Sequence, residues 1–95
     1  MSIAEQRQED GGIIIVLRGS FDATEAHRLL DVLARLPASA RVSVDFHEAR
    51  LVDDCAFAMV AKQAIAEHAP TVELVGLSGH LHRLLRYITS SPVLH

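Results

Sequence analysis

The chain has little of several residue types that mark particular classes of protein, and each shortage excludes something. It contains one cysteine, so no disulfide can form within it, which is typical of a reducing compartment. It contains no tryptophan and few other aromatic residues, so its core must be built mainly from Ile, Val, Leu and Ala side chains. It also lacks an excess of basic residues. The formal net charge of −3 argues against binding the phosphate backbone of a nucleic acid.

Long apolar segments are missing as well. No apolar run approaches the roughly 20 residues that a membrane-spanning helix needs. The first ten residues, MSIAEQRQED, do not have the basic-then-apolar order of a secretory signal. We therefore expect a soluble protein of the cytoplasm that does not insert into a membrane. With 95 residues, 49% hydrophobic and 22% charged, residues 1–95 are expected to form a single globular domain.

Hydrophobic periodicity divides the chain into alternating strands and helices. The segments expected to be strands are Ser2–Gln8, Ile13–Leu17, Arg41–Phe46 and Val72–Val75. The segments expected to be helices are Ala23–Leu36, Asp54–His68 and His80–Ile88. Between the first two strands, Gly11-Gly12 predicts the turn of a hairpin.

The strand patterns also indicate how the sheet is covered. Ile13–Leu17 is an unbroken apolar run, which is typical of a strand covered on both faces. Arg41–Phe46 and Val72–Val75 alternate between apolar and polar residues, which places helices mainly on one side. Strands that alternate with helices form parallel βα units, and the first hairpin adds an antiparallel edge. The predicted fold is α/β, with a mixed, mostly parallel sheet and helices packed mainly on one face.

The stretch Leu51–Val60, LVDDCAFAMV, carries the candidate site. Asp53 and Asp54 directly precede an apolar helical run, where a side-chain oxygen can accept hydrogen bonds from the first N–H groups of the helix. Capping of the helix and contact with a partner are both open for these two carboxylates, and likewise for Asp22 ahead of the first helix. The face of the helix opposite its core stripe is flatter and less charged than a purely solvated face, which suits a contact patch. Its residues are Cys55, Ala58, Met59 and Lys62.

Three motifs in order resemble those of the STAS domain, which is found in sulphate transporters and in bacterial anti-sigma factor antagonists. Gly19-Ser20-Phe21-Asp22 resembles the Gly-x-apolar-Asp turn of the family, and residues 51–57 resemble its apolar-apolar-Asp-Ser-Ser-Gly-Leu motif. Residues 74–85 resemble the strand and Val-Gly turn that lead into its third helix. The resemblance extends from about Gly12 to Ile88.

This resemblance implies a binding module that is not an enzyme. In antagonist members, the second Ser of the Asp-Ser-Ser-Gly turn is phosphorylated by a kinase that is itself the anti-sigma factor, and only the unphosphorylated form binds it. Carried over by position, Asp53 matches the motif Asp, Asp54 the first Ser, Cys55 the phosphorylated Ser and Ala56 the Gly. Asp22 matches the Asp of the neighbouring turn. The resemblance implies that this turn, the motif turn and the start of the helix after it, Ala56 included, form the surface that contacts the partner. The implied partner is an anti-sigma factor, a serine-kinase-like ATPase.

The chain departs from the family motif at the position that carries the switch. A thiol at Cys55 is not a substrate for that kind of kinase, so we expect no phosphate there. Asp54 brings one fixed negative charge, whereas a phosphate brings about −1.5 to −2 charges and three acceptor oxygens. We therefore expect a constitutive binder that has lost the switch.

Two alternatives stay open at this point. Ala58 and the absent serines also resemble the small STAS subunits that bind the ATPase of bacterial lipid-transport ABC systems. A small thiol enzyme that uses Cys55 with His47 or His80 is the other alternative. We expect no metal, because His80 and His82 point in different directions on a helix. We also expect no cofactor, because Gly76-Leu77-Ser78-Gly79 lacks the lysine and the longer spacing of a phosphate-binding loop.

Overall fold

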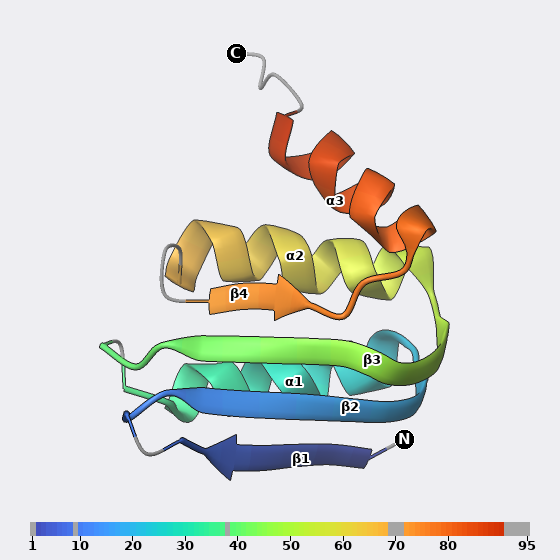
Figure 1. Cartoon of the computed structure of the whole chain (residues 1–95). Helices are drawn as coiled ribbons and strands as arrows, with labels where there is room; N and C mark the ends of the chain where they lie inside the picture. Colours follow the sequence, from blue (N-terminus) through green and yellow to red (C-terminus); the bar gives the residue numbers. More distant parts are fainter. Residues whose placement is uncertain (1, 9, 38, 69–71, 91–95) are drawn as a thin grey trace.

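The computed structural model describes residues 2–8, 10–37, 39–68 and 72–90. Strands and helices alternate within these ranges after an initial hairpin (Figure 1). The elements in chain order are β1 (Ser2–Arg7), β2 (Ile13–Phe21), α1 (Ala23–Arg35), β3 (Val42–Val52), α2 (Asp54–His68), β4 (Val72–Val75) and α3 (Gly79–Ser90). Every strand and helix expected from the periodicity is present, and β2 and β3 are much longer than expected.

The four strands form a mixed sheet in the order β1-β2-β3-β4. β1 runs antiparallel to β2, whereas β2, β3 and β4 are mutually parallel, which confirms the predicted topology. The predicted hairpin turn is also confirmed. Gly11 has a φ of +90°, a conformation that glycine adopts without steric cost, and the Gln8 N–H donates to the Gly12 carbonyl at 2.7 Å.

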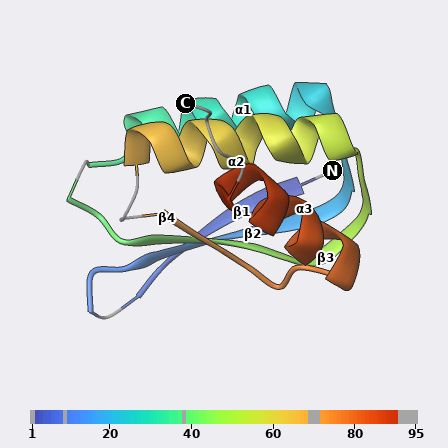
Figure 2. The same ribbon diagram turned by 90° about the horizontal axis from the view of Figure 1, so that it is seen from above.

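Both long helices lie on the same face of the sheet, as predicted (Figure 2). The buried side chains between the two layers come from alternate positions of β2 and β3 and from one stripe of each helix. The fully or nearly fully buried members of this core are Ile13, Ile15, Leu17, Phe21, Ala26, Leu29, Leu33, Val44, Phe46, Ala56, Phe57, Val60, Ala61 and Ala64. α3 packs against α2 beyond the edge strand β4 (Figures 1 and 2).

The second face of β2 differs from the expectation of a strand covered by other elements on both sides. None of the described helices lies on that face (Figure 2). Val16 is nevertheless 7% exposed, and Ile14 is half-buried. Both residues have strand neighbours on either side: Val16 pairs with Ala4 and with Asp45. A central position in the sheet, rather than a second layer, therefore accounts for the apolar run.

Both β2 and β3 extend beyond the apolar segments that predicted them. β2 continues through Gly19 and Ser20, where the sequence predicted a turn, and β3 continues to Val52. The pairing between them shifts register twice, between Val16 and Arg18 and between Gly19 and Ser20, so that β3 uses more residues than β2 over the same length. Arg18 pairs with Glu48 across the two strands, with Nε 2.9 Å from Oε1. This guanidinium holds the pKa of the Glu48 carboxyl below its ordinary value. The result is that β2 and β3 end side by side, with Phe21 opposite Val52.

Candidate functional site

Two acidic turns lie next to each other at the carboxyl ends of β2 and β3. The β2–α1 turn contains Asp22 and the β3–α2 turn contains Asp53, each directly after one of the paired residues Phe21 and Val52. The two turns are joined, because the Asp53 N–H donates to the Phe21 carbonyl at 2.9 Å. A hollow lies between them, lined by Ser20, Phe21, Asp22, Leu51, Val52 and Asp53.

Both aspartates that open these turns cap a helix. Asp22 Oδ1 accepts a hydrogen bond from the Glu25 N–H of α1 at 3.0 Å, and Asp53 Oδ2 accepts one from the Ala56 N–H of α2 at 2.9 Å. Each carboxylate thereby satisfies a helix N–H that has no intrahelical acceptor. The capping interpretation is confirmed for both residues. Since both residues are exposed, capping leaves them accessible to a partner as well.

Asp54 makes a contact that sequence reasoning missed. Nε2 of His80 lies 2.9 and 3.0 Å from the two carboxylate oxygens of Asp54, so the imidazole nitrogen carries the proton and donates it. The two residues stand at the first turns of α2 and α3 and are 26 positions apart. Both side chains are more than half exposed, at 56% for Asp54 and 61% for His80. His80 therefore belongs to the same surface as the acidic turns.

The next residues of α2 divide between core and surface as a helix start requires. Cys55 and Lys62 are exposed, as expected for the outer face of the helix. Ala58 and Met59 are only half-buried, and Met59 packs against the edge of the core, so these two are partly accessible. Ala56 is 0% exposed, because it points into the core beside Phe57. The side chain of Ala56, which was expected at the contact surface, is thus inaccessible to a partner. We name the accessible set, which is the candidate for contact with a partner, the docking surface: Asp22, Asp53, Asp54, Cys55, Ala58, Met59 and Lys62, with His80 and Leu51 added from the structure.

Leu51 was not among the predicted site residues. Leu51 is 70% exposed, and among the described residues Leu51 and Tyr87 are the large hydrophobic residues that lie exposed. The signal was present in the sequence. Leu51 and Val52 are consecutive in a strand, so only one of them can point into the core. The register shift at Ser20 and Leu51 leaves Leu51 on the solvent side.

The thiol-enzyme alternative needs Cys55 close to His47 or His80. No hydrogen bond between these residues is present in the described part of the chain. Cys55 is a free, exposed thiol. The His80 ring hydrogen-bonds to Asp54, and His47 donates its backbone N–H to Asp45 Oδ1 at 2.8 Å. Within residues 2–8, 10–37, 39–68 and 72–90, no group of three His, Cys, Asp or Glu residues is placed to hold a metal ion.

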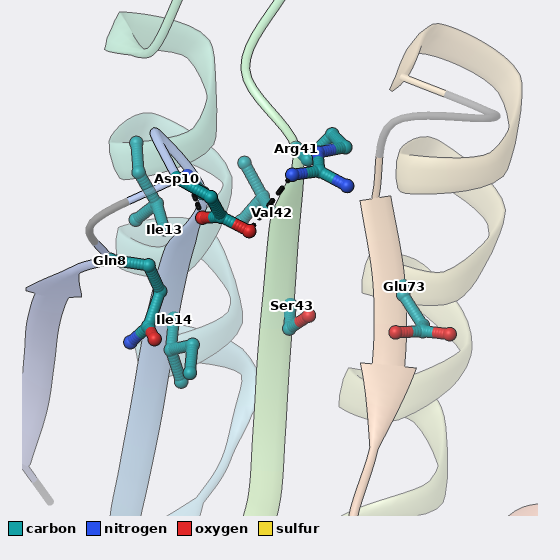
Figure 3. A pocket seen from close by; sticks show the side chains of 9 residues that line it. Gln8, Asp10, Ile13, Ile14, Arg41, Val42, Ser43 and Glu73 are labelled. Atoms are coloured by element: carbon teal, nitrogen blue, oxygen red, sulfur yellow. Dashed lines mark hydrogen bonds and ion pairs between the residues drawn. The ribbon is translucent and has the colours of Figure 1, made fainter.

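A second hollow lies at the opposite end of the sheet and has a different character (Figure 3). Asp10 is one of its lining residues. The Asp10 carboxylate accepts a hydrogen bond from the Gly12 N–H at 2.9 Å and another from the Arg41 guanidinium at 3.0 Å. The Gly12 N–H, assisted by Arg41, holds the pKa of Asp10 below its ordinary value. These contacts join the β1–β2 hairpin to the start of β3. We interpret this end of the sheet as structural, because its contacts hold the hairpin against the start of β3.

The comparisons with known proteins identify the family of the chain. Residues 4–90 match the model of a protein family described as Mlab, STAS domain. A comparison with curated proteins gave no match. In the described part of the chain, no helix is both long enough and apolar enough to cross a membrane.

Proposed function

Because the chain belongs to the STAS domain family, we propose that it is a non-catalytic protein-interaction module of the cytoplasm, similar to anti-sigma factor antagonists. Its partner is an anti-sigma factor of the serine-kinase-like ATPase class. The partner binds the docking surface, at the start of α2 and the adjacent β2–α1 turn. Membership of the family supports the general role, and the geometry of this surface supports its location.

One observation carries the proposal: the hydrogen bond from the Asp53 N–H to the Phe21 carbonyl. It fixes the two acidic turns relative to each other before any partner arrives, so little conformational freedom remains to be lost on binding. The exposed Leu51 lines the same hollow as the two aspartates. An apolar side chain surrounded by charged groups is typical of a docking surface.

The proposed module binds its partner constitutively. The position of the phosphorylated serine holds Cys55, and residues 53–56 include no hydroxyl side chain. The carboxylate of Asp54 carries a single charge and is hydrogen-bonded to His80. It therefore supplies neither the charge nor the three free oxygens of a phosphate.

We expect the chain to retain a serine-kinase-like ATPase in an affinity pull-down from its source cells, identified by mass spectrometry. Asp54→Lys and Lys62→Glu each reverse a charge on the docking surface and are expected to reduce the recovered partner at least about tenfold. Neither residue caps a helix, whereas removing the Asp53 cap would itself cost about 1 kcal/mol of stability.

Glu73→Lys is the matched control, since Glu73 is exposed on β4 and alternates with the core-facing residues of that strand. Its recovery of the partner should equal that of the unmodified chain. Undiminished recovery with both docking-surface variants would rule out this surface.

The missing switch gives a separate prediction. Cys55→Ser places a hydroxyl at the exposed position of the phosphorylated serine. Incubated with the partner kinase and ATP, this variant should gain one phosphate, and the unmodified chain should gain none at that position. Peptide mass spectrometry locates the modification. A phosphate on Cys55 itself would contradict the proposal that the switch is lost.

A second candidate uses the same surface. In that case the chain is a small subunit that regulates the ATPase of a lipid-transport ABC system. Ala58 favours this candidate, because its small, half-buried side chain leaves a flat surface on α2. The pull-down separates the two candidates, since the recovered protein would then be an ABC ATPase and the chain would fractionate with membranes only when that ATPase is present.

A further inference from the structure

The outer edge of β1 is a second surface, at the end of the sheet remote from β4. In the described chain β1 pairs with β2 alone, so one side of its backbone has no strand partner. Such an edge can accept a further strand, and proteins usually prevent this with charged side chains. β1 does carry charges, but their arrangement is unusual. Glu5 and Arg7 have opposite signs and are two residues apart.

The pairing with β2 shows which backbone groups of β1 are directed outward. The Gln8 N–H donates to the Gly12 carbonyl of the hairpin, which makes Gln8 and Gly12 a hydrogen-bonded pair. In an antiparallel ladder such pairs alternate with pairs that do not exchange hydrogen bonds. Gln6 and Ala4 therefore direct their N–H and C=O groups toward β2. Glu5 and Arg7 direct theirs to the free edge.

The side chains of Glu5 and Arg7 are on one face of the sheet. They pair with Ile15 and Ile13, which belong to the core face, and they contact each other at 3.3 Å. The Arg7 side chain is 70% exposed and that of Glu5 is 35% exposed. Both are accessible to a strand that approaches the edge.

We infer that the edge of β1 binds the same edge of a second copy of this chain. In a two-fold antiparallel arrangement centred on Gln6, Glu5 of each copy is opposite Arg7 of the other. These are also the residues whose N–H and C=O groups face outward. The same register therefore forms both the backbone hydrogen bonds and the pairs of opposite charge between the two copies. Moving the centre by one residue places Glu5 opposite Glu5, or Arg7 opposite Arg7. Charge repulsion thus selects the register centred on Gln6.

The resulting dimer has a continuous eight-stranded sheet, twice the four strands of each copy. The contact involves short strands and is small, so the dimer is expected to be weak and dependent on protein concentration. The docking surface is carried mainly by α2, which packs near β4 and away from β1 (Figure 1). Each dimer therefore presents two free docking surfaces.

Charge reversal tests the inference. Sedimentation equilibrium over a range of protein concentrations should show a monomer–dimer equilibrium for the unmodified chain. Glu5→Arg and Arg7→Glu each turn both opposed pairs into like charges and should weaken dimerisation about tenfold or more. The double variant Glu5→Arg/Arg7→Glu restores opposite charges and should return the dimer to within about threefold of the unmodified chain.

Circular dichroism establishes that each variant is folded, and restoration by the double variant excludes a folding defect. A chain that is monomeric at every concentration would overturn the inference. So would single variants that dimerise as the unmodified chain does, or a double variant that stays as weak as the single ones. Recovery of the partner in the pull-down depends on the docking surface and not on the β1 edge. Failure of the dimer therefore leaves the proposed function unaffected, and the two results can be distinguished.

Discussion

Replacing Phe46 by alanine is expected to lower the free energy of unfolding by about 3–5 kcal/mol, the largest effect of any substitution considered for this chain. Phe46 is 3% exposed and lies between two other aromatic rings. Its centroid is 5.4 Å from that of Phe21 and 5.3 Å from that of Phe57, both in edge-to-face geometry. The substitution removes both aromatic contacts and leaves a cavity where β2, β3 and α2 meet.

Urea denaturation followed by circular dichroism measures this loss as a lower transition midpoint at an unchanged slope. Tyr87→Ala is the matched control, because it also removes an aromatic ring, but from a side chain that is 73% exposed. We expect its effect to stay within about 0.5 kcal/mol. Equal effects of the two substitutions would show that the three rings do not hold the core together.

The loss of the Phe46 ring should also disturb the geometry of the docking surface. Phe21 supplies the carbonyl that binds the Asp53 N–H, and Phe57 follows the capped first turn of α2. A core that relaxes around the missing ring no longer fixes these two elements relative to each other. Partner recovery should therefore fall even at temperatures where Phe46→Ala remains folded.

The second large effect is expected for Gly76→Ala, which should destabilise the fold by about 2–5 kcal/mol. Gly76 has a φ of +68°, a left-handed conformation that costs other residues about 1–2 kcal/mol. An added Cβ would also lie 2.7 Å from the backbone nitrogen of His47 and would collide with Oδ1 of Asp45. That carboxylate already accepts the His47 N–H at 2.8 Å, so it cannot retreat without losing a hydrogen bond. Such overpacking typically costs a further 1–3 kcal/mol.

Gly79→Ala provides the control within the same turn. The nearest atom to an added Cβ there is 3.6 Å away, at Arg83, and Gly79 has no positive φ. Alanine at this first position of α3 should be neutral or stabilising by up to about 1 kcal/mol. Thermal unfolding of the two variants compares them directly. If Gly76→Ala melts at the same temperature as Gly79→Ala, the close approach of this turn to β3 does not matter for stability.

The order and type of the elements were predictable because their signals are local. The stripe Ala26, Leu29 and Leu33 of α1 and the alternation of Val42, Val44 and Phe46 in β3 each lie within one element. The lengths of β2 and β3 were not predictable in the same way. Gly19-Ser20 looks like the end of a strand, and only its pairing with β3 across two register shifts extends the strand to Phe21.

In the candidate site, too, the features that depend on local sequence were predictable and those that depend on tertiary packing were not. Capping by Asp22 and Asp53 follows from their positions directly before a helix, and both caps are present. The contact between Asp54 and His80 joins two helix starts that are 26 residues apart, and it exists only because α3 packs against α2. No pattern within either segment contains that information. The part of the docking surface built by tertiary packing was therefore beyond reach of the sequence.

Adjacent positions at the start of α2 face opposite constraints. The residue at position 56 is 0% exposed, so only a small side chain fits there, whereas the residue at position 55 is exposed. Exchanging the thiol for a hydroxyl at position 55 is therefore expected to leave stability within about 0.5 kcal/mol of that of the unmodified chain. Under the proposed function, a change at this one exposed position would be enough to restore covalent control, because it would leave the packing of the core unaltered.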